Sequence, residues 1–524
     1  AAVENRRAIR AVNMAILTAE GCDELARSVV NNTGLIEAAG ISHNGGRIKL
    51  DGGDAGEVSN SGTLSVASEK GEGGLVTIEA RAIELQDGSV IDATGATGGG
   101  SVLVGGDWQG GANVERRVFD HPNALRQATT VSMGSGGLID ASATDSGDGG
   151  TVVLWSEVEN PDSVTTVAGE ILAKGGENGG NGGQIETSGH ELEIAGARVQ
   201  AGARHGDGGL WLLDPTDSTI DQTAANAYVA TLNTGTDVEN LVTGSMVMAS
   251  GVDIHKSAGG DATLTLKASN RITLDSGSQI RSSAGELEVV LFANHSGTAG
   301  GISLDSATIE SNGGDIVLGG FGNPLNNAAY GVPHGVNLAN GTRLDAGAGD
   351  ISIRGESYSG DSDGIGVRMH TIAGLNGHDI YINGMGAPSG DNGSNWGVSM
   401  EVNAPITASG TLTIVGHGGG WNVSNGVVTG GSDHGVYIAV PDVLQGSGGV
   451  SITGTAGGNA GSTGNNGVEI NTATLRSGAG ALTITGKEFR GGGPGMVIAN
   501  GVTLGSATAG EQTGAITLRA DSLS

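Results

Sequence analysis

The stretch Gly73-Gly74-Leu75-Val76-Thr77-Ile78 joins a glycine pair to a short apolar run, and this arrangement recurs five more times within residues 1–220. The pairs begin at residues 45, 73, 99, 149, 182 and 208, so the successive steps are 28, 26, 50, 33 and 26 residues. A nearly fixed period of this length is typical of a solenoid, in which each turn stacks only on its neighbours. The step of 50 residues is interpreted as two turns with one glycine pair missing.

A second landmark keeps nearly the same spacing. It is a short run that ends in alanine and other small residues, as in Ile91-Asp92-Ala93-Thr94-Gly95. The other examples begin at Ile36, Leu64, Ile139, Leu172 and Val199. Two independent landmarks with one period predict a turn that contains at least two strands.

Residues 311–524 repeat with a longer period. Runs of the Asp-Ile-x-Ile kind are aligned on Ile316, Ile351, Ile380, Leu412, Val450, Leu482 and Ile516, and the 200 residues from the first to the last span six steps of about 33. We predict that these seven side chains form one inward ladder. Between them lies a Gly-Val series, which consists of Gly335-Val336, Gly366-Val367, Gly397-Val398, Gly435-Val436 and Gly467-Val468.

The composition favours the same architecture. Glycine accounts for 100 of the 524 residues, whereas aromatic residues make up 3%. Glycine tolerates sharp turns, and stacked aliphatic ladders need few large side chains. Collagen is excluded because the glycines lack a three-residue period. The predicted fold class is therefore all-β: a right-handed parallel β-helix, or solenoid, with short helical insertions.

The pattern divides the chain into four segments. Residues 1–30 carry apolar residues at helical spacing, including Ile9, Val12 and Ile16, and are predicted to form a helical segment packed on the shaft. Residues 31–220 form β-helix turns of roughly 26–28 residues. Residues 221–310 are a transition region, with a short helix predicted for Ala224–Leu241 and then further turns. Residues 311–524 carry the repeats of roughly 33 residues. Neither end resembles a cap, so the chain is expected to be a segment of a longer polypeptide.

The charge and the motifs exclude several functions. The formal net charge of −31 and the scattered basic residues argue against nucleic acid as a partner. No catalytic residue, cofactor site or metal site is predicted, so the chain is not expected to be an enzyme. The carboxylates of Asp361 and Asp363 could bind calcium, but a polar turn is the favoured interpretation of this stretch. The histidines, among them His378 and His434, are dispersed without metal-ligand spacing.

Two tryptophans are the candidate ligand-binding residues. Trp396 and Trp421 lie in loops rich in glycine, asparagine and serine, where an exposed ring could stack on a sugar. Trp108, Trp155 and Trp211 adjoin strand-like runs instead, and for these three packing within the shaft is the favoured interpretation.

Four stretches resemble the filamentous-haemagglutinin-like exoproteins of two-partner secretion, and they occur in the same order. They are Gly99-Gly100-Ser101-Val102-Leu103-Val104-Gly105-Gly106-Asp107-Trp108-Gln109-Gly110, Gly147-Asp148-Gly149-Gly150-Thr151-Val152-Val153-Leu154-Trp155-Ser156, Gly182-Gly183-Gln184-Ile185-Glu186-Thr187-Ser188-Gly189 and Trp211-Leu212-Leu213-Asp214-Pro215. The resemblance implies a right-handed β-helix on the outer surface of a Gram-negative bacterium. It also implies export through a dedicated outer-membrane β-barrel transporter. The family's secretion domain is absent from this stretch of chain, which would then be shaft.

Three hypotheses for function remain. The favoured one is the structural shaft of a secreted bacterial surface adhesin or fibre, in contact with host or neighbouring-cell surfaces and their glycans. The second is a subunit of a self-assembling extracellular filament, whose partners are copies of itself. The third is a β-helix protein that binds or cleaves polysaccharide. Cleavage would call for paired carboxylates at one register of adjacent turns, and the acidic positions differ from turn to turn.

Overall fold

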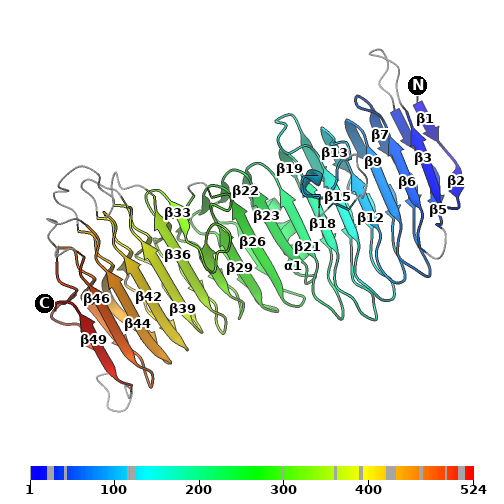
Figure 1. Ribbon diagram of the computed structural model, residues 1–524. Coiled ribbons are helices and arrows are strands. Elements are labelled where there is room, and N and C mark those ends of the chain that lie inside the picture. Colours follow the sequence, from blue (N-terminus) through cyan, green and yellow to red (C-terminus); the bar gives the residue numbers. More distant parts are fainter. Residues whose placement is uncertain are drawn as a thin grey trace. The chain divides into compact units, whose positions relative to one another are not determined.

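The computed structural model describes residues 2–19, 29–40, 44–114, 117–118, 125–297, 300–358, 363–388, 394–420, 432–458, 464–489, 493–505 and 514–523. Nearly all of their regular structure is β-strand, and the strands that meet in consecutive turns pair in parallel (Figure 1). The prediction of a parallel β-solenoid is thus confirmed. The chain divides into two compact units. The first comprises residues 1–218, 222–242 and 256–264, and the second comprises residues 219–221, 243–255 and 265–524.

The first unit has three parallel sheets, and each turn adds one strand to each of them. The first sheet contains β1 (Ala2–Asn5), β4 (Val29–Asn32), β7 (Glu57–Asn60), β10 (Ala82–Leu85), β13 (Thr130–Met133), β16 (Val164–Val167) and β19 (Glu191–Glu193). The second contains β2 (Ala8–Ala11), β5 (Leu35–Ala38), β8 (Thr63–Ser65), β11 (Val90–Asp92), β14 (Leu138–Asp140), β17 (Glu170–Leu172) and β20 (Arg198–Gln200). The third contains β3 (Met14–Thr18), β6 (Arg47–Asp51), β9 (Leu75–Glu79), β12 (Ser101–Val104), β15 (Thr151–Trp155), β18 (Gln184–Ser188), β21 (Leu210–Asp214) and β23 (Asp237–Val242).

Both sequence landmarks of the first unit mark its turns. The runs that follow the glycine pairs are the strands of the third sheet, and their second residues stack in register: Ile48, Val76, Val102, Val152, Ile185 and Trp211. The alanine-ending runs belong to the second sheet. One landmark was misplaced by a residue, because the register partner of Ile139 is Ile171 and not Leu172. Ile171 is buried and Leu172 is only half-buried, as expected from the alternation of side chains along a strand.

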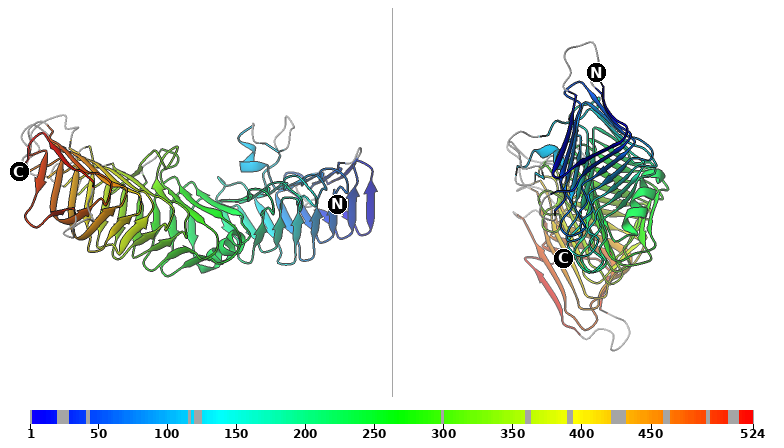
Figure 2. Two further views of the ribbon diagram at one scale, coloured as in Figure 1. Left: turned by 90° about the horizontal axis from the view of Figure 1, so that it is seen from below. Right: turned by 90° about the vertical axis from the view of Figure 1, so that its right-hand side faces the viewer.

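The interpretation of the 50-residue step as two turns is wrong. Val102 of β12 pairs directly with Val152 of β15, so the step is one turn that contains an insertion between β12 and β13. Figure 2 shows part of this insertion as a light-blue segment outside the stacked strands. It begins with a short 3-10 helix, η1 (Trp108–Gly111), whose Trp108 is 3% exposed and packs with Leu103 and Val153 on the outer side of the third sheet. The covered face explains why both sides of these strands are apolar.

The prediction of a helical segment over residues 1–30 is also wrong wherever the structure describes it. Residues 2–18 contain β1, β2 and β3, which pair with the strands of the next turn. Along β3, Ala15 and Leu17 are buried and lie in register with Ile48 and Leu50, whereas Met14 and Ile16 are exposed. Pairing and burial in the solenoid therefore outweigh the helical spacing of the apolar residues.

Three buried asparagines connect the first turns of the first sheet. The side-chain amide of Asn5 donates to Asn32 Oδ1 at 2.7 Å, and that of Asn32 donates to Asn60 Oδ1 at 2.7 Å. Asn32 and Asn60 are fully buried. Their hydrogen bonds satisfy polar groups that would otherwise be costly inside the core.

We expect the variant Asn32→Ala to lose about 1–3 kcal/mol of unfolding free energy, because both neighbouring amides lose a buried partner. The matched control is Asn31→Ala, since Asn31 is half-buried on the opposite face of the same strand. Urea titration followed by circular dichroism measures the difference. Equal stability of the two variants would contradict a structural role for this ladder.

The second unit also adds three strands in most of its turns. One row, here named the Gly-Val sheet, contains β24 (Met246–Met248), β27 (Ile272–Leu274), β30 (Ile302–Asp305), β34 (Val336–Ala339), β37 (Val367–His370), β40 (Val398–Glu401) and the first parts of β43 (Val436–Gly446) and β45 (Val468–Arg476), followed by β47 (Met496–Ile498). The next row contains β25 (Asp253–Lys256), β28 (Gln279–Ser282), β31 (Thr308–Glu310), β35 (Arg343–Asp345), β38 (Gly374–Gly377), β41 (Ile406–Ala408), the last parts of β43 and β45, and β48 (Thr503–Leu504). The third row contains β29 (Leu287–Phe292), β32 (Ile316–Gly319), β33 (Ala329–Gly331), β36 (Ile351–Ser357), β39 (Ile380–Met385), β42 (Thr411–His417), β44 (Gly449–Thr455), β46 (Leu482–Lys487) and β49 (Ile516–Ala520).

The predicted ladder of the second unit is in register at every step, from Ile316 to Ile516. Six of its seven side chains are at most 1% exposed. Ile516 is the exception at 45%, because β49 is the last strand of its row and is paired on one side only. The position of Ile516 in the ladder is confirmed, but its side chain is not buried as the prediction of an inward ladder requires.

The Gly-Val series is confirmed as the start of β34, β37, β40, β43 and β45, and its valines are stacked on one another. Glycine is needed at these positions because two rows meet closely there. At Gly397, for example, an added Cβ would lie 2.3 Å from the backbone nitrogen of His417. Any larger residue would force the two rows apart.

The helix predicted for Ala224–Leu241 exists, but it begins two residues earlier and ends nine residues before Leu241. Helix α1 spans Gln222–Leu232 and buries Tyr228, whose ring meets Trp211 edge-on at 6.1 Å between centroids. Residues 237–242 form β23 instead, because they continue the third sheet of the first unit beside β21. Strands β22 (Ser218–Ile220), β25 and β26 (Ala262–Ala268) contain residues of both units.

Candidate functional site

Trp396 lies in an aromatic cluster at the start of β40, in the second unit. Its ring centroid is 4.6 Å from that of Tyr437 and 5.5 Å from that of His434. The indole N–H donates to the carbonyl of Ser432 at 2.6 Å. One face of the indole is therefore engaged by protein, and the residue as a whole is half-buried. The other candidate, Trp421, lies outside the described residues.

His434 is the polar part of this cluster, and it is 5% exposed. The backbone N–H of Asn466 donates to its Nδ1 at 3.1 Å, which leaves the proton on Nε2, 3.3 Å from a carboxylate oxygen of Glu469. Burial lowers the pKa of His434, and the charge of Glu469 opposes that effect. The imidazole is thus held in one orientation, next to Tyr437.

The sequence pointed to Trp396 but not to its neighbours, because His434 and Tyr437 are distant in the chain. The turn register brings them together. The N–H of Gly397 donates to the carbonyl of His434, so Trp396 and His434 are equivalent positions of consecutive turns. The Gly-Val series was the sequence signal that could have revealed this cluster. The residues that precede its glycines occupy equivalent positions in consecutive turns, at the start of the Gly-Val sheet strands.

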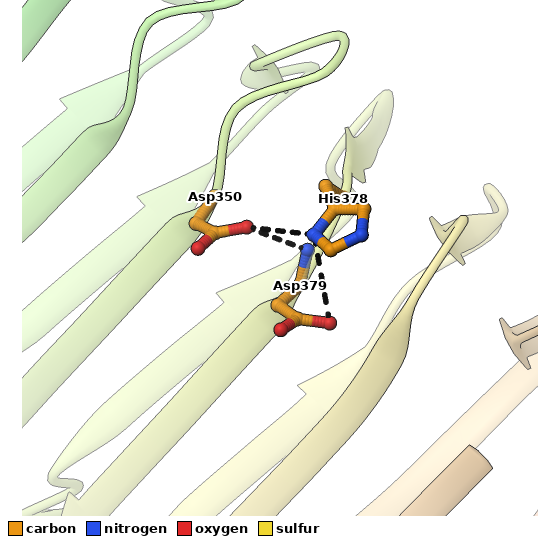
Figure 3. A group of neighbouring side chains, drawn as sticks. All are labelled: Asp350, His378 and Asp379. Atoms are coloured by element: carbon orange, nitrogen blue, oxygen red, sulfur yellow. Dashed lines mark hydrogen bonds and ion pairs between the residues drawn. The ribbon is translucent and has the colours of Figure 1, made fainter. Parts of the chain in front are cut away.

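Asp350, His378 and Asp379 offer three possible metal-ligand atoms within 4.8 Å of one another. The Nδ1 atom of His378 is 3.2 Å from Asp350 Oδ1 and 3.8 Å from Asp379 Oδ1 (Figure 3). The sequence predicts dispersed histidines, but the turn-to-turn register brings His378 beside an aspartate that is 28 residues away.

These two aspartates already have a structural task. The backbone N–H of Asp350 donates to Asp315 Oδ1, that of Asp379 donates to Asp350 Oδ1, and that of Thr411 donates to Asp379 Oδ1, at 2.8, 2.9 and 2.6 Å. The hydrogen bonds from Thr411 lower the pKa of Asp379 and so favour its charged form. Asp315, Asp350 and Asp379 thus stand at one register of adjacent turns, so the expectation that acidic positions differ from turn to turn is wrong here. The ladder explains why aspartate precedes the isoleucine in these three repeats. Three exposed or half-exposed ligands are also fewer than a structural zinc or calcium site uses.

A buried carboxyl group lies under the insertion of the first unit. Glu186 is 0% exposed, and its oxygens accept hydrogen bonds from the backbone N–H of Gln109 at 2.8 Å and from the hydroxyl of Ser188 at 2.9 Å. Burial raises the pKa of Glu186 to about 8, helped by the charges of Asp214 and Asp107 and opposed by the two hydrogen bonds. This carboxyl is therefore mainly protonated at neutral pH.

The three tryptophans assigned to packing are buried. Trp108 is 3%, Trp155 6% and Trp211 0% exposed. The indole N–H of Trp155 donates to Gln127 Oε1, and that of Trp211 donates to Thr187 Oγ1, each at 3.0 Å. The packing interpretation is confirmed for all three.

Asp361 lies outside the described residues, whereas Asp363 is described. The Oδ1 atom of Asp363 accepts the backbone N–H of Ser394 at 3.0 Å. That contact fits the polar-turn interpretation of this residue.

Comparison with known proteins does not identify the chain. No protein-family model matches it, and no curated protein matches it in a sequence search. Within the described ranges, the helices are too short or too polar to span a membrane.

Proposed function

We propose that this chain is the structural shaft of a secreted bacterial surface adhesin or fibre. The observation that carries the proposal is the stacking itself. Turn after turn repeats one aliphatic ladder in the core, such as Ile316 to Leu482, and presents side chains outward on several rows. The length of such a solenoid increases with each added turn, so the fold suits a protein that has to be long.

The four family-like stretches support this interpretation through their packing. Three of the four stretches supply Trp108, Trp155 and Leu212, which belong to one buried cluster around the insertion. Export through an outer-membrane β-barrel transporter and a location outside the cell follow as parts of the proposal.

Two alternatives remain. A self-assembling filament would use contacts between copies, which the net charge of −31 opposes at low ionic strength. A polysaccharide-binding role is favoured over polysaccharide cleavage by the half-buried rings of Trp396 and Tyr437, since aromatic faces suit sugar rings.

Immunogold electron microscopy of native cells tests the proposal. An antibody raised against residues 1–524 should label structures outside the outer membrane, and a strain that lacks the gene should lose both the label and a measurable part of its adhesion to surfaces. Label confined to the cell interior would contradict the proposal. Label outside with unchanged adhesion would favour the filament alternative.

A further inference from the structure

A row of hydrogen-bonding side chains follows the outer face of the Gly-Val sheet. On each strand, the residue of this row directly follows the buried isoleucine or valine that stacks in the core. In chain order the residues are Thr273, Ser303, Asn337, Arg368, Ser399, Tyr437 and Glu469. Neighbours in this row are about 4.8 Å apart, which is the spacing of paired strands. All are half-buried except Ser399, which is buried. The row reaches the cluster of Trp396 at Tyr437.

A pocket of about 190 Å³ opens on this row. It is lined by Ser303, Asn337 and Arg368 of the row, by Arg271, and by the loop from Val332 to His334. It is smaller than the 300–1,000 Å³ of typical drug-sized sites, so it suits one compact group.

Two arginines of the pocket have no carboxylate partner among the described residues. Arg271 donates through Nη2 to the carbonyl of Val332 at 2.8 Å, and Arg368 donates through Nη1 to Asn337 Oδ1 at 3.3 Å. A guanidinium has five N–H donors, and its planar fork matches the two oxygens of a carboxylate. In a chain with a net charge of −31, two such arginines on one pocket are unusual.

His334 adds a further polar group to the pocket. Its Nδ1 atom is buried and has no hydrogen-bond partner among the described residues. Burial and the charge of Arg368 lower its pKa to about 4, and the charge of Asp363 partly opposes this, so the imidazole is neutral at pH 7. Asp363 is the carboxylate that acts on this histidine, and its Oδ1 atom already accepts the N–H of Ser394. A buried polar atom without a partner is a group that a ligand can satisfy.

We propose that this pocket binds the carboxylate of an acidic sugar, with the arginine pair on the charge and Ser303 and Asn337 on the adjacent hydroxyl groups. The pocket volume selects a single sugar acid, and the negative charge of the chain opposes long polyanions such as nucleic acid. The polar row and the aromatic cluster offer positions for the sugars that follow. The inference deepens the proposed function by naming a glycan class and a site.

Isothermal titration of the purified chain tests the site. The probes are 3′-sialyllactose and trigalacturonate, which carry the carboxylate on a sialic acid or on a uronic acid, with lactose and methyl-esterified trigalacturonate as their uncharged counterparts. At least one acidic probe should bind, at least about tenfold more tightly than its uncharged counterpart. Binding should weaken as sodium chloride is raised.

Arg368→Gln and Arg271→Gln should each weaken binding of the acidic probe about tenfold or more. Arg343→Gln is the control, because Arg343 is exposed and pairs with Glu310 on another row. Arg271 is exposed, so its variant keeps the test valid if Arg368→Gln does not fold. Equal affinity in all three variants, equal binding of charged and uncharged probes, or binding of inorganic sulfate without either sugar acid would overturn the proposal. Failure here leaves the surface-labelling experiment unaffected, since this test uses purified protein.

Discussion

Replacing Ile380 with aspartate is expected to open the turns around β39 to protease. Ile380 is 1% exposed and is stacked between Ile351 and Leu412, so a carboxylate at this position would have no partner in a dry core. Leaving a charge uncompensated in such a core costs several kcal/mol, or the turn opens to admit water. Limited proteolysis with mass mapping should find new cleavage sites near β36, β39 and β42. The turns near Val102 should stay protected, because each turn of a solenoid depends mostly on its neighbours.

The matched control for this variant is Thr413→Asp. Thr413 is half-buried on the outer face of β42, one strand from Ile380, so an added carboxylate there reaches water. Ser394 is a poorer control, because its N–H donates to Asp363 and a new carboxylate would lie close to an existing one. If Ile380→Asp were cleaved uniformly in both units, the chain would unfold as one cooperative body. The idea of turns supported mainly by their neighbours would then fail.

The variant Glu186→Gln is expected to remove a pH dependence from the stability of the first unit. The folded-state pKa of Glu186 is raised from 4.5 to about 8, so between these values the folded chain holds a proton that the unfolded chain releases. Unfolding is then favoured by rising pH. The stabilising contribution of this protonated carboxyl is complete below about pH 4.5, declines up to about pH 8 and is absent above it.

Each unit of pKa difference corresponds to about 1.4 kcal/mol, so the loss from pH 5 to pH 8 amounts to a few kcal/mol. Glutamine keeps an oxygen to accept the N–H of Gln109 and carries no charge at any pH. Thermal unfolding at pH 5, 7 and 9 should show a steeper decline for the unmodified chain than for Glu186→Gln. Glu191→Gln, on the exposed face of β19, should behave like the unmodified chain. Parallel pH profiles for the unmodified chain and Glu186→Gln would show that this carboxyl is ionised in the folded state.

The core register could be predicted from the sequence because it is a local property repeated many times. Each turn has to place an aliphatic residue above the one in the preceding turn, so the period of the chain records the stacking directly. The ladder from Ile316 to Leu482 and the Gly-Val series follow from this rule alone. The period does not predict the register where a segment outside the repeat is inserted between two strands. The insertion after β12 is nearly as long as a turn, so the sequence period alone does not distinguish it from one.

The neighbours of the candidate residues could not be predicted in the same way. Trp396 was visible as an aromatic residue in a polar loop, but Tyr437 and His434 reach it through the register of later turns. Residues 2–18 show the opposite problem. Their helical spacing is real, yet pairing with the next turn decides in favour of strands.

The sequence by itself determined the solenoid, its periods and the residues that stack in its core, because these depend on short patterns that the chain repeats. Only the tertiary structure decided that a buried carboxyl lies under an insertion, that an aspartate ladder holds successive turns together, and that Arg271 and Arg368 share a pocket with His334. These arrangements join side chains from different turns and loops. The number of residues between these side chains depends on the lengths of the intervening loops. The stacking of turns therefore brings the side chains together without any recurring sequence signal.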